Sequence, residues 1–320
     1  MSASPTFLAT ALAGAALLSP LAAHACSSCG CTLNADWPTQ GLGDGPGWSA
    51  DLRHDFFVQD ELRHGTSTVN RAALPIPNDA EVQLKTVNRN TTLTLDRAIG
   101  TDWGVSVLLP WLKRVHTTIG EGDTDASGSR SDSVGDVRVI GRWQGFSPEG
   151  DIGVQFGLKL PTGDTHVRFS SGPLAGEPLD RGLQPGTGTT DLLLGAYGFG
   201  TLSPAIDAYA QAMLQLPMNT ASGFRPGAGI NATVGARLAT QGPVVPHLQL
   251  NVRSERPESG PLADVDNSGA TLVYLSPGLT WRAGAAWSVY AFGQVPVFQD
   301  VRGMQLEPRW SVSAGVRARF

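Results

Sequence analysis

The chain has 320 residues, of which 41% are hydrophobic and 16% are charged, and its formal net charge at pH 7 is -5. Its basic residues occur singly rather than in patches, which excludes a nucleic-acid partner. Glycine is abundant, with 39 residues, and the mean hydropathy is close to zero. The apolar residues are therefore diluted by alternation instead of being collected in blocks.

The first 25 residues predict a secretory signal peptide. Residues 6–23 form an apolar stretch rich in Ala and Leu, and Ala23-His24-Ala25 is a cleavage site of the A-x-A type. We expect a mature chain that begins at Cys26 and leaves the cytoplasm. Past this leader no apolar run reaches the roughly twenty residues that a transmembrane helix needs, so any membrane insertion must be by strands.

After a periplasmic N-terminal segment over 26–48, a barrel domain over 49–320 is expected. Period-two alternation of apolar and polar residues, bounded by Gly, Pro, Asp and Asn, indicates about twelve strands. They are expected at 49–59, 84–99, 103–116, 134–144, 151–161, 191–200, 205–215, 228–240, 244–254, 271–282, 287–298 and 307–320.

Short and long connections alternate between these strands. Tight turns are expected at 100–102, 145–150, 201–204, 241–243 and 283–285, and long polar loops at 60–83, 117–133, 162–190, 216–227 and 255–270. An up-and-down barrel with short periplasmic turns and long external loops has this asymmetry. The sequence therefore predicts an all-β fold, a transmembrane antiparallel up-and-down β-barrel, with both termini on the periplasmic side.

The last strand supports a location in the bacterial outer membrane. From Trp310 to Phe320, apolar residues alternate strictly with Ser, Gly and Arg, so one face suits lipid and the other suits water. A terminal strand that ends in Phe also resembles the signal read by the outer-membrane barrel assembly machinery. Lipid and this machinery are the expected macromolecular partners, besides a small-molecule permeant.

Charged and polar residues fall on the inward face of most strands. A lipid-facing Arg or Lys near the bilayer midplane would cost roughly 2 to 4 kcal/mol, so these side chains should line the lumen. Two segments fit poorly, because 191–200 is apolar or Gly on both faces and His54 lies among apolar residues. The residues expected to line the path of a permeant are Arg138, Arg142, Lys159, Asp207, Arg237, His247, Gln249, Asn251, Arg253, Arg317 and Arg319.

All three cysteines, Cys26, Cys29 and Cys31, fall within six residues at the expected mature N-terminus. Their C-x-x-C-x-C spacing suits a soft metal ion such as Cu(I) or Zn(II). A disulfide in the oxidising periplasm and lipidation of Cys26 are alternatives. The segment 26–48 is also long enough to fold inside the barrel as a plug.

The sequence does not predict an enzyme. The histidines are scattered without H-E-x-x-H or H-x-H spacing, and there is no G-x-S-x-G motif. His247 with Ser311 or Ser313 in the lumen is a minor alternative, a hydrolase in the barrel wall. No cofactor is expected beyond the possible soft metal ion at the cysteines.

Two phrases carry a family resemblance: GLKLPTGD from Gly157 to Asp164, and LQPGTG from Leu183 to Gly188. Together they resemble the outer-membrane proteins labelled as meta-pathway phenol-degradation proteins or transporters. Cys29-Gly30-Cys31, followed by Leu33-Asn34 and Asp36-Trp37, is similar to a subset with a cysteine-bearing N-terminus. The resemblance implies passage of small, hydrophobic or aromatic compounds. The competing hypothesis is a barrel-anchored periplasmic module for copper, zinc or thiol redox chemistry.

Overall fold

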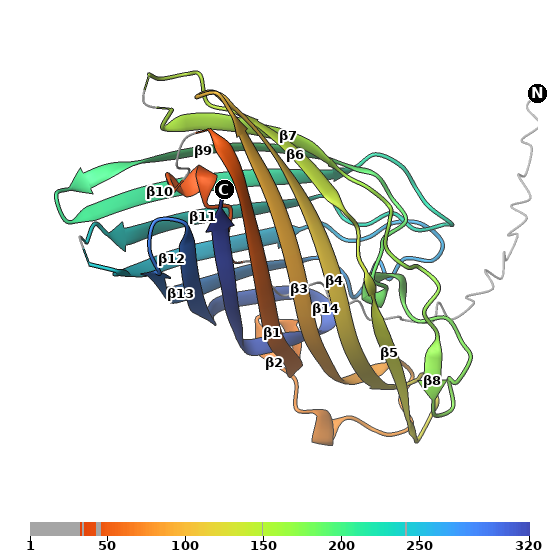
Figure 1. Cartoon of the computed structure of the whole chain (residues 1–320). Coiled ribbons are helices and arrows are strands. Elements are labelled where there is room, and N and C mark those ends of the chain that lie inside the picture. The colour runs from red at the N-terminus through yellow and green to blue at the C-terminus, as the bar shows by residue number, and fades with distance from the viewer. Residues whose placement is uncertain (1–32, 34, 43–45, 149, 241) are drawn as a thin grey trace, which may run out of the picture.

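The computed structural model describes residues 33, 35–42, 46–148, 150–240 and 242–320, and these form a closed antiparallel β-barrel (Figure 1). Three short 3-10 helices accompany it in the described residues: η1 (Pro38–Gln40), η2 (Arg71–Ala73) and η3 (Arg181–Leu183). None of these helices is long and apolar enough to cross a membrane. The cysteines and the expected signal peptide lie outside the described residues.

Each strand of the barrel wall pairs with two neighbours, so the sheet has no free edge in its ring. In spatial order the eleven strands of the ring are β1 (Gly47–Gly65), β14 (Trp287–Arg319), β13 (Ala270–Arg282), β12 (Val244–Glu255), β11 (Gly229–Leu238), β10 (Ile206–Pro217), β9 (Asp191–Ser203), β7 (Ile152–Lys159), β6 (Arg138–Trp143), β4 (Trp103–Ile119) and β3 (Val82–Ile99). β3 closes the ring by pairing with β1.

β14 accounts for two of the strands expected from the sequence. Its first part, up to Val301, pairs with β13, and the part from Val301 to Arg319 pairs with β1. The Nε2 of Gln299 donates to the Pro308 carbonyl at 3.1 Å, and Gly303 has a positive φ of 65°. β14 is thus a hairpin of two legs, and with the ten other strands of the ring it gives twelve crossings of the wall.

Three shorter strands extend this wall: β2 (Ser67–Thr68), β5 (Ala126–Val134) and β8 (Phe169–Ser171). β5 corrects the sequence prediction, which assigned most of its residues to the loop 117–133. It pairs with residues Trp111 to Ile119 of β4. Within β5 itself, Ser alternates with Gly, Arg and Asp, so there is no apolar face to signal a strand. β8 likewise lies inside the predicted loop 162–190.

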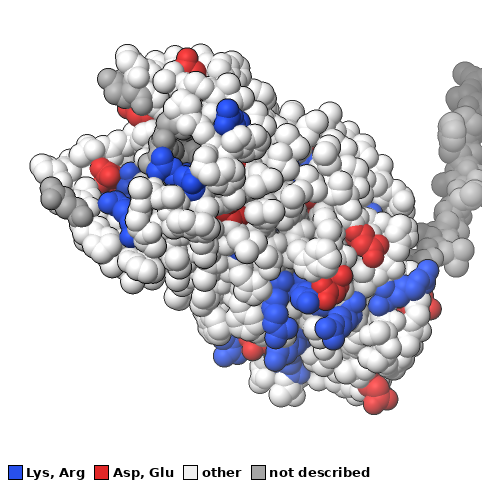
Figure 2. Space-filling view, viewed as in Figure 1, with Lys and Arg blue, Asp and Glu red and all other residues white. Residues whose placement is uncertain are grey.

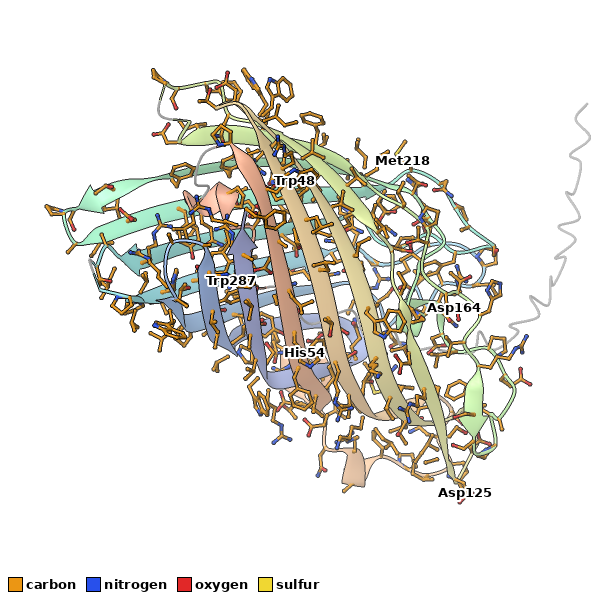
Figure 3. All side chains as sticks on the ribbon, in the orientation of Figure 1. Trp48, His54, Asp125, Asp164, Met218 and Trp287 are labelled. Atoms are coloured by element: carbon orange, nitrogen blue, oxygen red, sulfur yellow. The ribbon has the colours of Figure 1, made fainter. Side chains whose placement is uncertain are left out.

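The barrel has two unlike ends (Figure 3). We call one end of the barrel the turn end. It carries the short connections, the start of β1 and the end of β14, and Trp48 and Trp287 lie there. The opposite end, with Asp125, Asp164 and Met218, is the loop end. Four exposed tryptophans lie at the turn end: Trp48, Trp103, Trp281 and Trp287.

The two segments that fitted the alternation poorly have structural explanations. His54 faces outward, where its Nδ1 lies 2.9 Å from the Thr91 hydroxyl on the neighbouring strand. On β9 the inward residues Leu193 and Tyr197 are 1% and 4% exposed. Inward apolar side chains are tolerated there because η1 packs against β9 and keeps part of its inner face from water.

Near the turn end, inward-facing tyrosines lie over glycines of the neighbouring strand. Tyr197 pairs with Gly153, and Tyr209 pairs with Gly235. A Cβ at Gly153 or Gly235 would lie 2.4 or 2.3 Å from the Cζ of the facing ring. Each tyrosine ring therefore occupies the space that a side chain would need at the facing glycine, and the inner wall is closely packed there.

We predict that Gly235→Val destabilises the barrel, since the new side chain overlaps the Tyr209 ring. The expected loss is about 1 to 3 kcal/mol of unfolding free energy, the usual cost of overpacking. Urea unfolding followed by the gel mobility of the folded barrel measures it. Gly200→Val is the matched control, because a Cβ at Gly200 meets no heavy atom within 4 Å. Equal midpoints for the two variants would contradict the prediction.

Candidate functional site

The candidate site is the lumen, and the residues predicted to line it lie on inward-facing strand positions. Most are shielded from solvent by one another and by segments inside the barrel. Seven are 8% exposed or less: Arg142, Lys159, Arg237, His247, Arg317, Gln249 and Asn251. Asn251 is fully buried, and Arg138, Asp207, Arg253 and Arg319 are intermediate. The structure distributes them over the height of the barrel and does not gather them into one ring.

Several lumen charges are paired with a charge on a nearby strand or on the same one. Arg142 on β6 forms two hydrogen bonds to Asp96 on β3, one of them 3.1 Å long. Arg237 on β11 contacts Asp207 on β10 at 3.2 Å, and Arg253 pairs with Glu255 on its own strand. These contacts form salt-bridged ladders along the wall and do not place opposed charges across an open pore.

Neutral polar side chains form a hydrogen-bonded belt across the inner face of β11 to β14. Thr233 donates to Asn251 at 2.8 Å, and Asn251 donates to Ser276 at 2.8 Å. Gln294 donates to Ser276 at 3.1 Å and accepts from Ser311 at 2.9 Å. This satisfied network leaves the belt rigid and uncharged.

The belt residues Thr233, Ser276 and Gln294 were not among the predicted lining residues. Each occupies an inward position of its strand, so alternation could have found them. Small neutral side chains gave a weaker signal than the charged residues did.

The N-terminal residues 33 and 35–42, which we call the plug, lie inside the barrel at the turn end. Trp37 is its anchor, 4% exposed, with its ring centroid 4.7 Å from that of Tyr290 in an edge-on arrangement. The indole Nε1 donates to Asp51 at 3.1 Å, and the Tyr290 hydroxyl donates to the other oxygen of the same carboxylate at 2.8 Å. The Asp51 carboxylate therefore binds the plug through Trp37 and the wall strand β14 through Tyr290.

Further contacts tie the plug to other strands around the lumen. Arg237 donates to the carbonyl of Gln40, and Arg317 donates to the carbonyl of Leu42 at 2.7 Å. Two predicted lining residues thus bind the plug. Gln155 donates to Asp36 at 2.6 Å. Because these contacts come from β7, β11 and β14, the plug spans the lumen at this end.

The plug joins no strand of the sheet, and its fit depends on Gly41. This residue has φ of 74°, and a Cβ on it would lie 2.5 Å from the Phe199 ring. Around the plug lie cavities of about 280, 90 and 120 Å³. The largest opens beside Pro38, Trp48 and Arg142, and the other two border Trp37.

Burial raises the pKa of Asp36 above its ordinary value. Arg142 opposes this effect by stabilising the carboxylate, whereas the negative charge of Asp96 adds to it. The charged form of Asp36 is thus disfavoured while the plug is docked.

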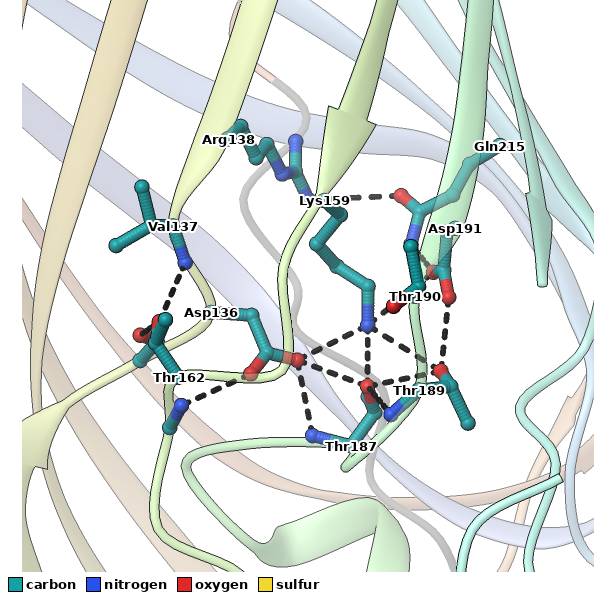
Figure 4. A network of polar contacts seen from close by, with 12 residues as sticks. Asp136, Val137, Arg138, Lys159, Thr162, Thr187, Thr189, Thr190, Asp191 and Gln215 are labelled. Carbon is teal, nitrogen blue, oxygen red and sulfur yellow. Dashed lines mark hydrogen bonds and ion pairs between the residues drawn. The ribbon is translucent and has the colours of Figure 1, made fainter. Parts of the chain in front are cut away.

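Lys159 lies at the centre of a network of polar contacts toward the loop end (Figure 4). Its Nζ lies 2.9 Å from Asp136 and 3.2 Å from Asp191, and it also contacts the Thr187 hydroxyl. Asp136 accepts backbone hydrogen bonds from Gly163 at 3.0 Å and from Thr187 at 2.9 Å. The 3% exposed ammonium group therefore fixes both ends of the segment 160–190 to the wall.

The segment 160–190, the inward loop, lies against lumen residues. Its Leu183 is fully buried, and the Leu183 carbonyl accepts from the inward-facing Arg114 of β4 at 2.6 Å. Arg181 stacks over Phe224 of the next loop at 5.1 Å. Lys159 was predicted as a residue facing a permeant, and in the structure it mainly holds this loop.

The minor hydrolase alternative receives no support from the described contacts. His247 packs between Trp37 and Phe292, with ring centroids 6.2 and 5.5 Å away. Ser311 and Ser313 donate instead to Gln294 and Asp55. The described residues contain no cluster of three or more metal-ligating side chains, and Cys26, Cys29 and Cys31 lie outside them.

One solved structure in particular supports the barrel fold. The COG4313 outer membrane channel from Pseudomonas putida F1 matches with a TM-score of 0.65 and 12% identity, over 90% of this chain and 99% of that one. The toluene transporter TbuX of Ralstonia pickettii gives a TM-score of 0.47 and 9% identity, with coverages of 87% and 90%. At such identities the likeness concerns the fold alone. No family model and no curated sequence matches the chain.

We predict that Lys159→Met loosens the inward loop, because Asp136 and Asp191 would face each other without the cation between them. Breaking a buried pair in this way costs about 3 to 5 kcal/mol. Limited trypsin digestion of the folded barrel should show faster cleavage after Arg168, an exposed residue of the loop.

Lys113→Met is the control for this experiment. Lys113 pairs with Asp132 on the outer surface, and its side chain is 50% exposed, so its removal should leave the digestion rate unchanged. Wild-type resistance in the Lys159 variant would mean that the loop is held by its apolar contacts alone.

Proposed function

We propose that this protein is an outer-membrane channel for small compounds, closed at its turn end by the plug and opened when the plug leaves. The observation that carries the proposal is the position of Trp37, buried in the lumen but belonging to no strand. A segment held by side-chain contacts can leave without breaking the sheet. The wall itself cannot open in this way, because its strands are joined by continuous backbone pairing.

Both the fold and the surface support the membrane location. The outward face of the terminal leg carries exposed Trp310, Val312, Val316 and Phe320, which suits lipid. Because the short connections lie at the turn end, we propose that this end faces the periplasm. We also propose that the strand ending in Phe320 is recognised by the barrel assembly machinery.

We propose that the permeants are small and include hydrophobic or aromatic compounds. Two of the cavities beside the plug are bordered by Trp37, and one of these also by Tyr290. Aromatic side chains provide apolar contact area and a polar edge, which suits ring-shaped solutes. The resemblance of the GLKLPTGD and LQPGTG phrases to the phenol meta-pathway family points the same way. Transport of this kind requires no catalytic residue.

The test is single-channel conductance in planar bilayers for the wild type and for Trp37→Ala. Removing the indole deletes the aromatic anchor, at a cost of about 3 to 5 kcal/mol for plug docking. This shifts the docking equilibrium by more than about 100-fold, so the variant should show larger or more frequent conductance steps.

Trp310→Ala is the matched control, since this tryptophan is 49% exposed on the outer face and should leave conductance unchanged. A chain without residues 33–42 provides the limiting case. If neither this deletion nor Trp37→Ala conducts, the channel function is wrong. If the wild type already conducts as they do, the plug does not close the pore.

The raised pKa of Asp36 predicts a pH dependence of the channel. A carboxyl whose pKa is higher when docked favours docking at low pH, and this contribution is lost as the pH rises through the docked pKa. Conductance should therefore increase from acid toward neutral pH. Asp36→Asn keeps an acceptor oxygen for Gln155 but cannot ionise, so its conductance should stay low and lose this pH dependence. An unchanged pH profile in the variant would rule out Asp36 as the titrating group.

A further inference from the structure

Charge on the outward face of the barrel is unevenly distributed. The outward positions of β9 to β13 carry no Lys, Arg, Asp or Glu in the described residues, as expected for a surface in contact with lipid tails. The outward faces of β3 to β5 differ. Figure 2 shows Lys and Arg gathered over the part of these strands toward the loop end.

Four residues form this basic patch, and strand register brings them together. Arg89 on β3 pairs with Lys113 on β4, which pairs with Asp132 on β5. Arg130 lies two residues from Asp132 on β5, and Lys85 lies four residues from Arg89 on β3, on the same outward face. Adjacent strands are about 4.8 Å apart, so the basic patch of Lys85, Arg89, Lys113 and Arg130 covers three neighbouring strands.

The basic patch is not neutralised within the protein. Its one carboxylate, Asp132, lies 3.0 Å from Lys113 and accepts from the Trp111 indole at 2.7 Å. Lys85 and Arg130 form no ion pair or hydrogen bond within the part of the chain that the structure describes. Four cations and one carboxylate leave three positive charges on this face.

Aromatic residues border the basic patch and place it at the edge of the apolar band. Arg89 lies over the ring of Phe56, with its guanidinium carbon 5.7 Å from the centroid. Trp111 is 46% exposed on the outer face beside Lys113. From Trp103 at the turn end, Lys113 is about 33 Å along the strand, or about 25 Å along the barrel axis for a usual tilt, which is the height of the apolar band.

We propose that the basic patch binds the phosphate groups of a phosphorylated glycolipid in the outer leaflet, lipopolysaccharide in a bacterial outer membrane. Lys and Arg are the residues that recognise phosphate, with Arg able to bind it by two hydrogen bonds. Phe56 and Trp111 would contact the sugar and the start of the acyl chains. An acidic soluble partner fits less well, because these side chains border the lipid-facing surface. The inference rests on the outer-membrane location proposed above.

The test measures lipid binding by the detergent-solubilised full chain. Lipid A should bind and raise the unfolding temperature of the wild type, whereas lipid A without its phosphates should bind much more weakly. The triple variant Lys85→Gln, Arg89→Gln, Arg130→Gln should lose about 100-fold in affinity for lipid A, as expected for three basic residues at a membrane surface. Wild-type binding should also weaken with salt.

A matched control removes exposed charge elsewhere. Arg256 and Arg302 are exposed and lie away from β3 to β5, and the variant Arg256→Gln, Arg302→Gln should keep wild-type affinity. Equal binding of the two lipids, or unchanged affinity of the triple variant, would overturn the proposal. Displacement of lipid A by millimolar inorganic phosphate would also overturn it, since the site would then serve free phosphate.

Conductance of the triple variant separates this inference from the proposed channel. The basic patch lies on the outer face, so conductance should stay at the wild-type level. If the wild type conducts but binds lipid A equally with and without its phosphates, only the proposed lipid site is wrong. If the wild type binds phosphorylated lipid A but never conducts, only the proposed channel function is wrong.

Discussion

Closure of the backbone hydrogen-bonded ring is the constraint on which the rest of the structure depends. A strand in lipid has no water to satisfy its N–H and C=O groups, so each must pair with a neighbour on both sides. β3 meets β1 to complete the ring, and β14 folds back on itself to provide its last two legs. Once the ring is closed, every strand has one face toward the outside of the barrel and one toward the lumen. The alternation of the sequence follows from this.

Closure also decides how the interior is filled. A ring of this size encloses more space than its inward side chains need, and the chain fills that space in different ways along its height. Tyrosine rings over glycines pack the inner wall near the turn end, and the neutral belt binds one wall segment together. The plug and the inward loop occupy what remains. The lumen is therefore filled by two inserted segments and is not a uniform pore.

These two inserted segments differ in how they are held. The inward loop is fixed at both ends by Lys159, a buried ammonium group between two carboxylates, and such a pair is costly to break. The plug is held by one aromatic anchor, by hydrogen bonds to its carbonyls and by the hydrogen bond from Gln155 to Asp36. In the proposed channel, we infer that the loop sets the permanent width and that the plug is the part suited to move.

The sequence alone determined the architecture, because period-two alternation records which face of each strand lies outside the barrel, and alternating connection lengths record its up-and-down order. Each of its twelve predicted segments overlaps an observed strand or a leg of β14, and it placed Arg142, Arg237 and Arg317 on the inward face. It missed β5, since a strand of Ser, Gly and charged residues has no apolar face to reveal it.

Only the tertiary structure decided what the lumen residues do. That Asp51 binds Trp37, that Lys159 joins Asp136 to Asp191, and that Arg317 holds the plug depend on contacts between residues far apart in the chain. Alternation specifies the face on which a residue lies but not its height or its partner across the barrel. Those are set by strand register and by the segments that fold inside, which a local pattern does not encode.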